Sequence, residues 1–402
     1  MNARERVLTT LSHKQPDRVA IDIGATAATG LSIFNYHRYK ESQGLSTSDI
    51  KAMDLFGLFS YIQAEDAEVV GTDILLAPAL RPRFGVPIDR WKPYRFWNGS
   101  SFLVPEKMQT QKDAEGNLVL YSNGKPMGKM PVGGSSFSEI ANSSMGDIRD
   151  LPDDVPDVGT QDFSDSYTEE ELRFREETAK ALYEGTDKAI VVDCTENIRW
   201  NASIPEWLYS MALDEEKANA LHEKKSLALL KKIQQLAQAT GKYAQIFAIY
   251  QDWGTQRSEL VDPGMFARIV APHYHRIFDW IHANTQWKVF FHSCGSIFHL
   301  IPHMIDMGVD ILNPVQCDAA GMEPGKLKET YGDRLVFWGG GVDAQSCLKY
   351  GTPEEVSAQI KKRISILNEG GGYIFAPTQS IQTDVPLPNL IAMMETLKEV
   401  RI

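Results

Sequence analysis

The chain has 402 residues, of which 43% are hydrophobic and 23% charged, which is the composition of an ordinary globular protein. The formal net charge is −12 and no block of Lys and Arg interrupts it, which argues against a nucleic-acid or anionic-membrane surface. No stretch is apolar for long enough to span a membrane, and the four cysteines are too few for a disulfide scaffold. The first 18 residues lack the pattern of a secretory signal, so we expect a cytoplasmic location and reduced cysteines.

The first 80 residues predict helices and the first strands of a sheet. Val7, Leu8 and Leu11 share one face of a short helix, which Pro16 ends. Strands are expected at residues 19–23 and 68–75. We interpret residues 1–60 as an N-terminal helical extension of a single domain that spans residues 1–402.

Residues 81–166 have a different composition: they are rich in Pro, Gly and aromatic residues and show no helical periodicity. Within them, residues 102–110 and 118–121 flank a Gly-containing turn at residues 113–117, which predicts a β-hairpin. Residues 142–166 are polar and rich in Pro and Asp, as in a surface connection. We therefore expect a loop and β-hairpin insertion over residues 81–166.

The rest of the chain alternates short apolar strands with amphipathic helices, which indicates a parallel sheet. Strands are expected at residues 189–193, 243–249, 287–291, 309–312, 335–338 and 373–376. Helices are expected at residues 168–183, 203–212, 214–240, 263–284, 297–307, 324–331, 353–369 and 387–400.

Polar, chemically capable residues follow six of these strands, in the runs 193–196, 251–254, 292–295, 313–318, 339–343 and 377–380. An open doubly wound sheet concentrates such residues at one or two switch points, whereas a (β/α)8 barrel collects them from successive strands at one mouth. The first strand is not followed by the G-x-G-x-x-G run of a dinucleotide-binding fold. The pattern predicts an α/β protein with a (β/α)8 TIM barrel.

His292 and Cys294 alternate with Ser293 at the end of one strand, so imidazole and thiol point the same way. An N/S pair of this kind suits Zn²⁺, but two ligands do not complete a zinc site, and a buried Cys beside a hydrogen-bonded His gives the same pattern. The candidates for further ligands are Cys317, Gln379, Glu196 and Asp252.

Asp252 stands beside Trp253 after another strand, where a carboxylate can bind substrate or carry a proton, or simply anchor the loop. The run 339–343 ends in Asp343 and favours close approach of the backbone to a large flat ligand. The predicted site residues are as follows: catalytic Asp252, His292 and Gln316; substrate-binding Trp253, Asp343 and Gln379; metal-binding His292, Cys294 and Cys317.

In these residues the chain resembles the uroporphyrinogen decarboxylase superfamily, and specifically its corrinoid-linked methyltransferase branch. The likeness runs in order through RERVL (4–8), PDR (16–18), QDWGTQ (251–256), HSCG (292–295), ILNPVQ (311–316), FWGGGVD (337–343) and GGYIFAP (371–377). It covers most of the chain and is specific for the superfamily. The Arg-Gln-Ala-Gly-Arg signature by which the decarboxylases grip porphyrinogen carboxylates has no counterpart here.

The resemblance implies a methyltransferase that moves a methyl group from a small donor, such as a methoxylated aromatic ether, to Co(I) of a separate corrinoid protein. It also implies Zn²⁺ as a cofactor and a homodimer. In the related enzymes a His-x-Cys pair and a later Cys bind zinc; His292 and Cys294 match the pair, but Thr378 and Gln379 stand where the later Cys belongs. The alternative is the second half-reaction, in which zinc activates a thiol or a tetrahydrofolate-type acceptor to take methyl from methylcobalamin. That reaction fits this sequence less well, because the later Cys is missing.

Two readings from other classes stay open at this point. One is a lyase that decarboxylates a small carboxylate, and the other is a non-catalytic barrel that binds a tetrapyrrole.

Overall fold

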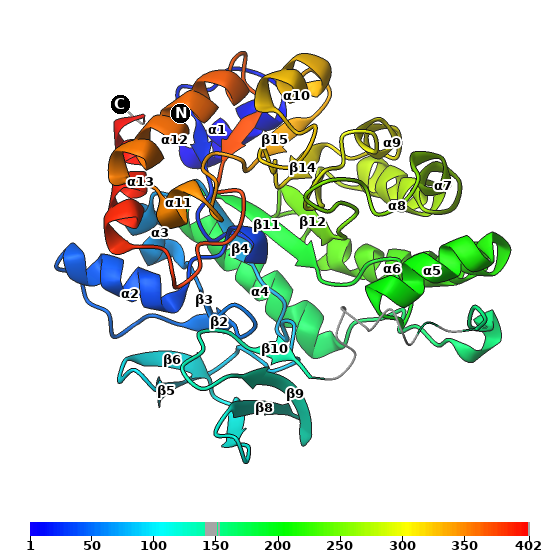
Figure 1. Cartoon of the computed structure of the whole chain (residues 1–402), viewed down its shortest axis with the longest axis horizontal. Coiled ribbons are helices and arrows are strands. Elements are labelled where there is room, and N and C mark those ends of the chain that lie inside the picture. Colours follow the sequence, from blue (N-terminus) through cyan, green and yellow to red (C-terminus); the bar gives the residue numbers. More distant parts are fainter. Residues whose placement is uncertain (141–150, 152, 401–402) are drawn as a thin grey trace.

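The computed structural model describes residues 1–140, 151 and 153–400. Eight parallel strands form one sheet in the order β1-β16-β15-β14-β13-β12-β11-β4, which curls into a nearly closed barrel flanked by helices (Figure 1). The prediction of a (β/α)8 barrel is therefore confirmed. The barrel strands are β1 (Ala20–Ile21), β4 (Ile74–Ala77), β11 (Ala189–Cys194), β12 (Ile246–Tyr250), β13 (Lys288–His292), β14 (Ile311–Asn313), β15 (Val336–Trp338) and β16 (Tyr373–Phe375).

The helices cover the outside of the barrel (Figure 1). They are α1 (Ala3–Leu11), α2 (Ile33–Ser42), α3 (Ala64–Val70), α4 (Glu169–Gly185), α5 (Ile204–Leu213), α6 (Glu215–Thr240), α7 (Pro263–Ile269), α8 (Ala271–Asn284), α9 (Ile301–Asp306), α10 (Pro324–Tyr331), α11 (Cys347–Tyr350), α12 (Pro353–Leu367) and α13 (Leu387–Glu399). Several begin at the caps that their sequences provide, as in the capping boxes of Ser203 with Glu206 and Thr352 with Glu355.

Side chains of the barrel strands alternate between two apolar clusters. The residues at every second position pack inside the barrel: Ala189 and Val191 of β11, Ile246 and Ala248 of β12, Phe290 of β13, Ile311 of β14, Val336 and Trp338 of β15 and Ile374 of β16. The positions between them pack outward against the helices. This period of two fixes which residue at each strand end points into the mouth.

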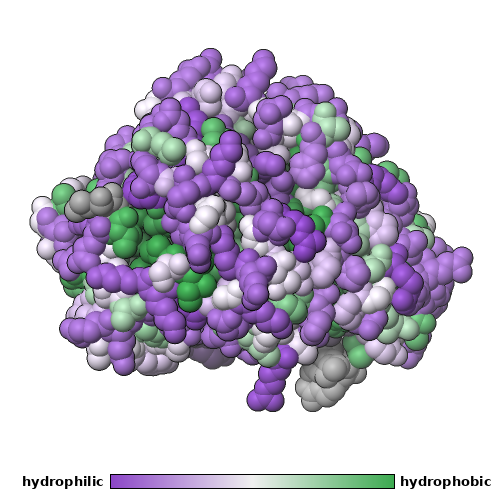
Figure 2. All heavy atoms as spheres, turned by 90° about the horizontal axis from the view of Figure 1, so that it is seen from above, coloured by the Kyte–Doolittle hydropathy of each residue, from purple (hydrophilic) through white to green (hydrophobic). Residues whose placement is uncertain are grey.

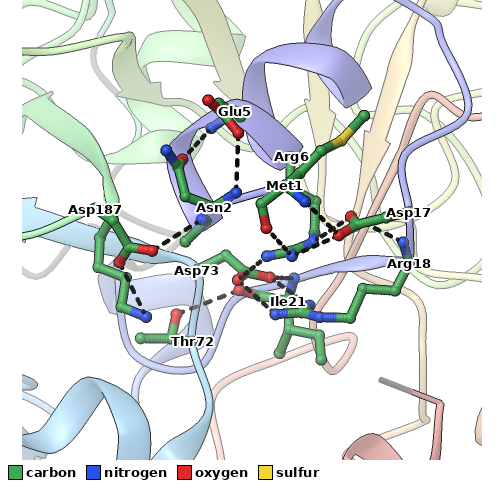
Figure 3. A network of polar contacts seen from close by, with 12 residues as sticks. Met1, Asn2, Glu5, Arg6, Asp17, Arg18, Ile21, Thr72, Asp73 and Asp187 are labelled. Carbon is green, nitrogen blue, oxygen red and sulfur yellow. Dashed lines mark hydrogen bonds and ion pairs between the residues drawn. The ribbon is translucent and has the colours of Figure 1, made fainter. Parts of the chain in front are cut away.

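The barrel closes where β4 meets β1, and Asp73 makes the join (Figure 3). The Asp73 backbone N–H donates to the Ile21 carbonyl at 2.7 Å, and its carboxylate accepts from the Ile21 N–H at 2.9 Å. The same carboxylate, 1% exposed, accepts from Arg6 at 2.9 Å and from Arg18 at 2.8 Å. Two guanidinium groups and one peptide thus hold a buried charge at the amino-terminal end of the barrel, the end that serves stability in this fold.

The region predicted as an insertion, residues 81–166, contains two small antiparallel sheets that extend away from the barrel (Figure 1). One pairs β5 (Trp91–Arg95) with β6 (Ser101–Pro105); the other contains β7 (Gln109–Lys112), β8 (Leu118–Ser122), β9 (Lys125–Met130) and β10 (Ser138–Glu139). The turn at residues 113–117 joins β7 to β8, as predicted, but the strand expected over residues 102–110 is divided between the two sheets. The expected connection at residues 142–166 lies partly outside the described residues.

Three other boundaries differ from the predictions. Residues 68–70 end helix α3, and the barrel strand begins only at Ile74 after a left-handed Gly71. Residues 1–60 hold barrel strand β1 and the β2–β3 hairpin (Ala52–Asp54, Phe59–Ser60) as well as helices, so they are not a purely helical extension. The single helix expected at residues 263–284 is interrupted at Val270, two residues before Pro272. Proline has no backbone N–H with which to continue the helical hydrogen bonds.

The face drawn in Figure 2 is largely hydrophilic, with hydrophobic residues gathered in a hollow on one side. Among the helices of the described residues, none combines the length and the apolar character needed to cross a bilayer.

Asp73→Asn tests the closure of the barrel. The amide keeps the shape of the side chain but removes a buried charge that pairs with Arg18 and, together with Asp17, with Arg6, so we expect unfolding in urea to cost about 3–5 kcal/mol less than for the wild type. Asp17→Asn is the control, because Asp17 also binds Arg6 but is 38% exposed, and its loss should be about 1 kcal/mol or less. Equal losses in the two variants would contradict the role given to Asp73.

Candidate metal centre

Three side chains from two neighbouring strand ends converge at the carboxyl end of the barrel. The ligand atoms of Asp252, His292 and Cys294 all lie within 4.8 Å of one another. His292 Nε2 is 3.4 Å from Cys294 Sγ and 3.6 Å from an Asp252 carboxylate oxygen. Nitrogen, sulfur and oxygen donors around one point are the set that Zn²⁺ accepts.

The loops after β12 and β13 bring these residues together because the two loops are hydrogen-bonded to each other. Trp253 N–H donates to Ser293 Oγ at 2.9 Å, Cys294 N–H to the Asp252 carboxylate at 2.9 Å, and Ser296 N–H to the Thr255 carbonyl at 2.7 Å. A Cβ on Gly295 (φ +86°) would meet the Thr255 carbonyl at 2.5 Å. Only glycine permits this approach, so the run HSCG ends in Gly for a reason of geometry.

His292 is oriented by a residue on the next strand. The Asn313 side chain donates through Nδ2 to the Trp338 carbonyl at 3.0 Å, which turns its Oδ1 toward His292. His292 Nδ1 lies 2.6 Å from that oxygen and donates to it, so Nε2, which faces Cys294 and Asp252, is the nitrogen that would bind a metal ion. Metal-binding histidines are commonly held in this way by an acceptor on the other ring nitrogen.

The electrostatics of the centre favour a cation. Burial lowers the pKa of His292, but negative charge on Cys294 and Asp252 and the hydrogen bond to Asn313 outweigh it and raise the pKa to about 9. The groups that stabilise a proton on His292 are the same groups that would stabilise a metal ion in its place. Asp252, whose side chain is 46% exposed, keeps the centre open to solvent.

Gln379, predicted to bind substrate, reaches the centre from the strand end after β16. Its Nε2 lies 3.0 Å from Cys294 Sγ. Rotation of the amide by half a turn would present Oε1 at the same place, so Gln379 is positioned either to donate to the thiolate or to bind a metal ion. It occupies the region where the resemblance leads one to expect a second cysteine.

Cys317 does not join the centre, which corrects the predicted ligand set. Its Sγ contacts the Gly340 carbonyl at 3.8 Å, and burial raises the pKa of the thiol to about 12. The loop after β14 turns this side chain toward the Gly-rich run after β15 instead of the mouth. Asp252, which was predicted as catalytic and was also among the candidates for a further ligand, is the residue that the structure brings beside His292 and Cys294.

The remaining predicted residues support the loops. Gln316 Oε1 accepts from the Gly295 N–H at 2.9 Å and so holds the turn after Cys294. Asp343 accepts from the Gln345 N–H at 2.9 Å and the Ser346 N–H at 3.2 Å, as a loop anchor. Trp253 is fully buried, 4.8 Å from Trp207 and 5.0 Å from Phe266 between ring centroids, so the structure places it beneath the loop and not at the mouth.

Metal analysis of four proteins tests the centre. The protein loaded with zinc and then dialysed should retain about one zinc per chain, and His292→Ala and Cys294→Ala should retain almost none, because each removes a ligand. Cys317→Ser is the matched control and should retain the wild-type amount. Zinc that disappears with Cys317 but survives loss of Cys294 would overturn this assignment.

Asn313→Ala tests the orientation of His292. Without the acceptor on Nδ1 the imidazole can rotate and change tautomer, so zinc affinity measured against a competing chelator should fall by roughly 10–100-fold. The donor atoms themselves are unchanged, so an affinity equal to that of the wild type would show that Asn313 does not orient the ring.

The chain can now be compared with known proteins. The family model of uroporphyrinogen decarboxylase (URO-D) matches residues 201–400, the part that carries the whole centre. No curated protein matches the chain. Among solved structures, a methyltransferase from Methanosarcina mazei is similar over 99% of this chain and 99% of its own, with a TM-score of 0.58 and 14% sequence identity, a likeness of fold. The family match is limited to residues 201–400, and the solved structure shares the fold.

Proposed function

We propose that the protein is a methyltransferase that moves a methyl group from a methyl ether, such as a methoxylated aromatic, to Co(I) of a corrinoid held by a partner protein. The observation that carries the proposal is the convergence of Asp252, His292 and Cys294 at the open mouth of the barrel. The superfamily and the methyltransferase that shares the fold support it.

The chemical difficulty in this reaction is the leaving group. The bond from the methyl carbon to oxygen breaks with its electron pair on oxygen while the carbon bonds to cobalt through the cobalt electron pair. The oxygen is then an alkoxide or phenoxide and takes up a proton from solvent. A site that stabilises charge on this oxygen lowers the barrier.

Zinc bound at the centre would supply Lewis acidity to that oxygen. Asp252, His292 and Cys294 would hold it, with a further position left for the donor or Gln379. Asn313 keeps His292 Nε2 available, and Gln316 keeps the Cys294 turn in place. The chain's own part in the reaction is thus to present these donors in a fixed arrangement and to leave Asp252 at the solvent side.

The make-up of the centre favours methyl removal from oxygen over thiol activation. Only one thiolate, Cys294, belongs to the group that the described residues form, and a carboxylate oxygen of Asp252 stands beside it. A carboxylate is a harder ligand than a thiolate and leaves the metal ion better suited to an oxygen donor. A centre for thiol activation would be expected to use a second cysteine, and Cys317 is turned away.

Methyl transfer can be followed from the spectrum of a corrinoid protein reduced to Co(I), mixed with the zinc-loaded enzyme and 4-methoxybenzyl alcohol. We expect methylation of the corrinoid that slows by roughly 100-fold in Cys294→Ala, because the leaving oxygen loses its stabilisation. Cys317→Ser should react at the wild-type rate.

Separate assays of the same protein distinguish the alternatives. Release of CO₂ from a small carboxylate without any corrinoid would support a lyase, and demethylation of methylcobalamin by a free thiol would support the second half-reaction. Tetrapyrrole binding with no turnover would support a binding protein.

A further inference from the structure

The inner face of the barrel mouth carries polar groups that the metal centre does not use. Below the mouth, Ala189 and Val191 of β11 and Ile246 and Ala248 of β12 point inward. The next inward positions on these strands are Asp193 and Tyr250. Tyr250 is the direct partner of His292 in the β12–β13 pairing, and the two ring centroids are 5.6 Å apart. Asp193 and Tyr250 therefore lie on the same inner face as the centre.

Both residues have enclosed polar atoms with no hydrogen-bond partner among the described residues. These atoms are the hydroxyl oxygen of Tyr250 and one carboxylate oxygen of Asp193, whose nearest charged group is the Arg175 guanidinium at 3.6 Å. An unpaired buried polar atom is costly, and native proteins keep few of them. Unpartnered groups from adjacent strands at one mouth indicate a place for a ligand.

Asp22 lies on the same inner face, because it binds the inward-facing Trp338, and Asp54 is a further buried carboxylate. Asp22 of the segment after β1 accepts from the Ala25 N–H at 2.8 Å and from Trp338 Nε1 at 3.0 Å. Asp54 accepts from the Phe56 N–H at 2.7 Å. Burial first, and then the negative charges of Asp193, Asp22 and Asp54, raise the pKa of Tyr250 well above its usual range. We call Asp22, Asp54, Asp193 and Tyr250 the acidic floor.

The positive charge near the floor is already engaged. Arg175 donates through Nε to Glu171 at 2.8 Å and through Nη1 to the Asp193 carbonyl at 2.9 Å, and it lies 3.6 Å from the Asp193 carboxylate. Asp22 and Asp54 are hydrogen-bonded by neutral N–H groups. Burial raises the pKa of Asp22 to about 6 and raises those of Asp54 and Asp193. Arg175 is shared with Glu171, and Arg83, whose charge also acts on Asp54, pairs with Glu139. A bound cation would therefore favour the ionised form of these buried carboxyls.

We propose that the acidic floor binds an organic cation, namely the ammonium group of a methyl donor whose methoxy end reaches the Asp252–His292–Cys294 centre. The proposal rests on the proposed function for the role of that ligand. Within the floor, Tyr250 is the strand partner of His292, and its hydroxyl can accept from the ammonium while its ring faces the charge. The Asp193 side chain, 15% exposed, and the Asp252 side chain, 46% exposed, leave a way in from solvent.

Three ligands of the same shape and different charge test this directly. They are 4-methoxyphenethylamine, which is a cation, 2-(4-methoxyphenyl)ethanol, which is neutral, and 4-methoxyphenylacetate, which is an anion. Calorimetric titration of the zinc-loaded full-length protein without any corrinoid should show the amine binding at least about tenfold more tightly than the alcohol. The anion should bind most weakly, because the floor repels it.

Two variants assign the effect to the floor. Asp193→Asn should weaken binding of the amine by about tenfold or more and leave the alcohol unchanged. Asp165→Asn is the control, since it removes the same charge from a surface pair with Lys231 whose carboxylate is 49% exposed, and it should change neither. Tyr250→Phe keeps the ring and removes the hydroxyl, so it should weaken the amine more than the alcohol even if Asp193→Asn does not fold.

Equal binding of the three ligands by the wild-type protein, or tightest binding of the anion, overturns the proposal. So does a folded Asp193→Asn variant that binds the amine as the wild type does. Because binding is read without methyl transfer, the two claims fail separately. Tight, Asp193-dependent binding of the amine without any methyl transfer would sustain the floor and refute the methyltransferase. Methyl transfer from the alcohol as readily as from the amine would sustain the methyltransferase and refute the floor.

Discussion

Asp73 joins the first strand of the barrel to the second, and the geometry of the mouth depends on that join. Its carboxylate and peptide fix Ile21, the residue before Asp22. Asp22 then accepts from Nε1 of Trp338 on β15, two strands away, and the carbonyl of Trp338 accepts from Asn313. Asn313 in turn sets the proton of His292. A buried ion cluster at the amino-terminal end is thus connected, through one polar contact after another, to the orientation of a ligand at the carboxyl end.

The two loops that form the centre are held by each other more than by the helices outside. Their backbone contacts leave no room for a side chain at Gly295, and the Asp252 carboxylate caps the peptide of Cys294 while it faces the His292 ring. This arrangement positions a carboxylate, an imidazole and a thiol before any ligand arrives. Preorganisation of this kind is what charge stabilisation in a transition state requires. The proposed acidic floor would select the donor by its charge, next to the centre through the pairing of Tyr250 with His292.

Much of the fold follows from local pattern. Short β-branched runs such as residues 189–193 fit only a strand buried on both faces, and the polar residues after each strand predict the mouth. The pairing of His292 with Cys294 follows from the period of two in a strand. The errors arise where tertiary contacts decide. The helix at residues 64–70 runs on to a left-handed Gly71, and the strand that pairs with β11 starts only after it.

The third ligand was harder to predict for a related reason. Cys317 is the better zinc ligand by residue type, and nothing in its local sequence shows that its loop turns toward Gly340. The sequence shows Asp252 as a carboxylate at a strand end. Its contact with Cys294, however, depends on hydrogen bonds between two loops, and the two residues are 42 positions apart in the chain. The roles of Asn313 and Tyr250 carried a usable signal, since both are the last inward residue of a barrel strand, the same position as His292.

X-ray absorption at the zinc edge of the loaded protein tests the central claim most directly, because it counts the sulfur atoms around the metal ion. The structure predicts one sulfur at about 2.3 Å, from Cys294, and nitrogen and oxygen ligands at about 2.0–2.2 Å for the rest, with an oxygen lost in Asp252→Ala. Two sulfur ligands would mean that Cys317 or another cysteine moves into the centre. That result would contradict the proposed ligand set and return thiol activation as the better account of the reaction.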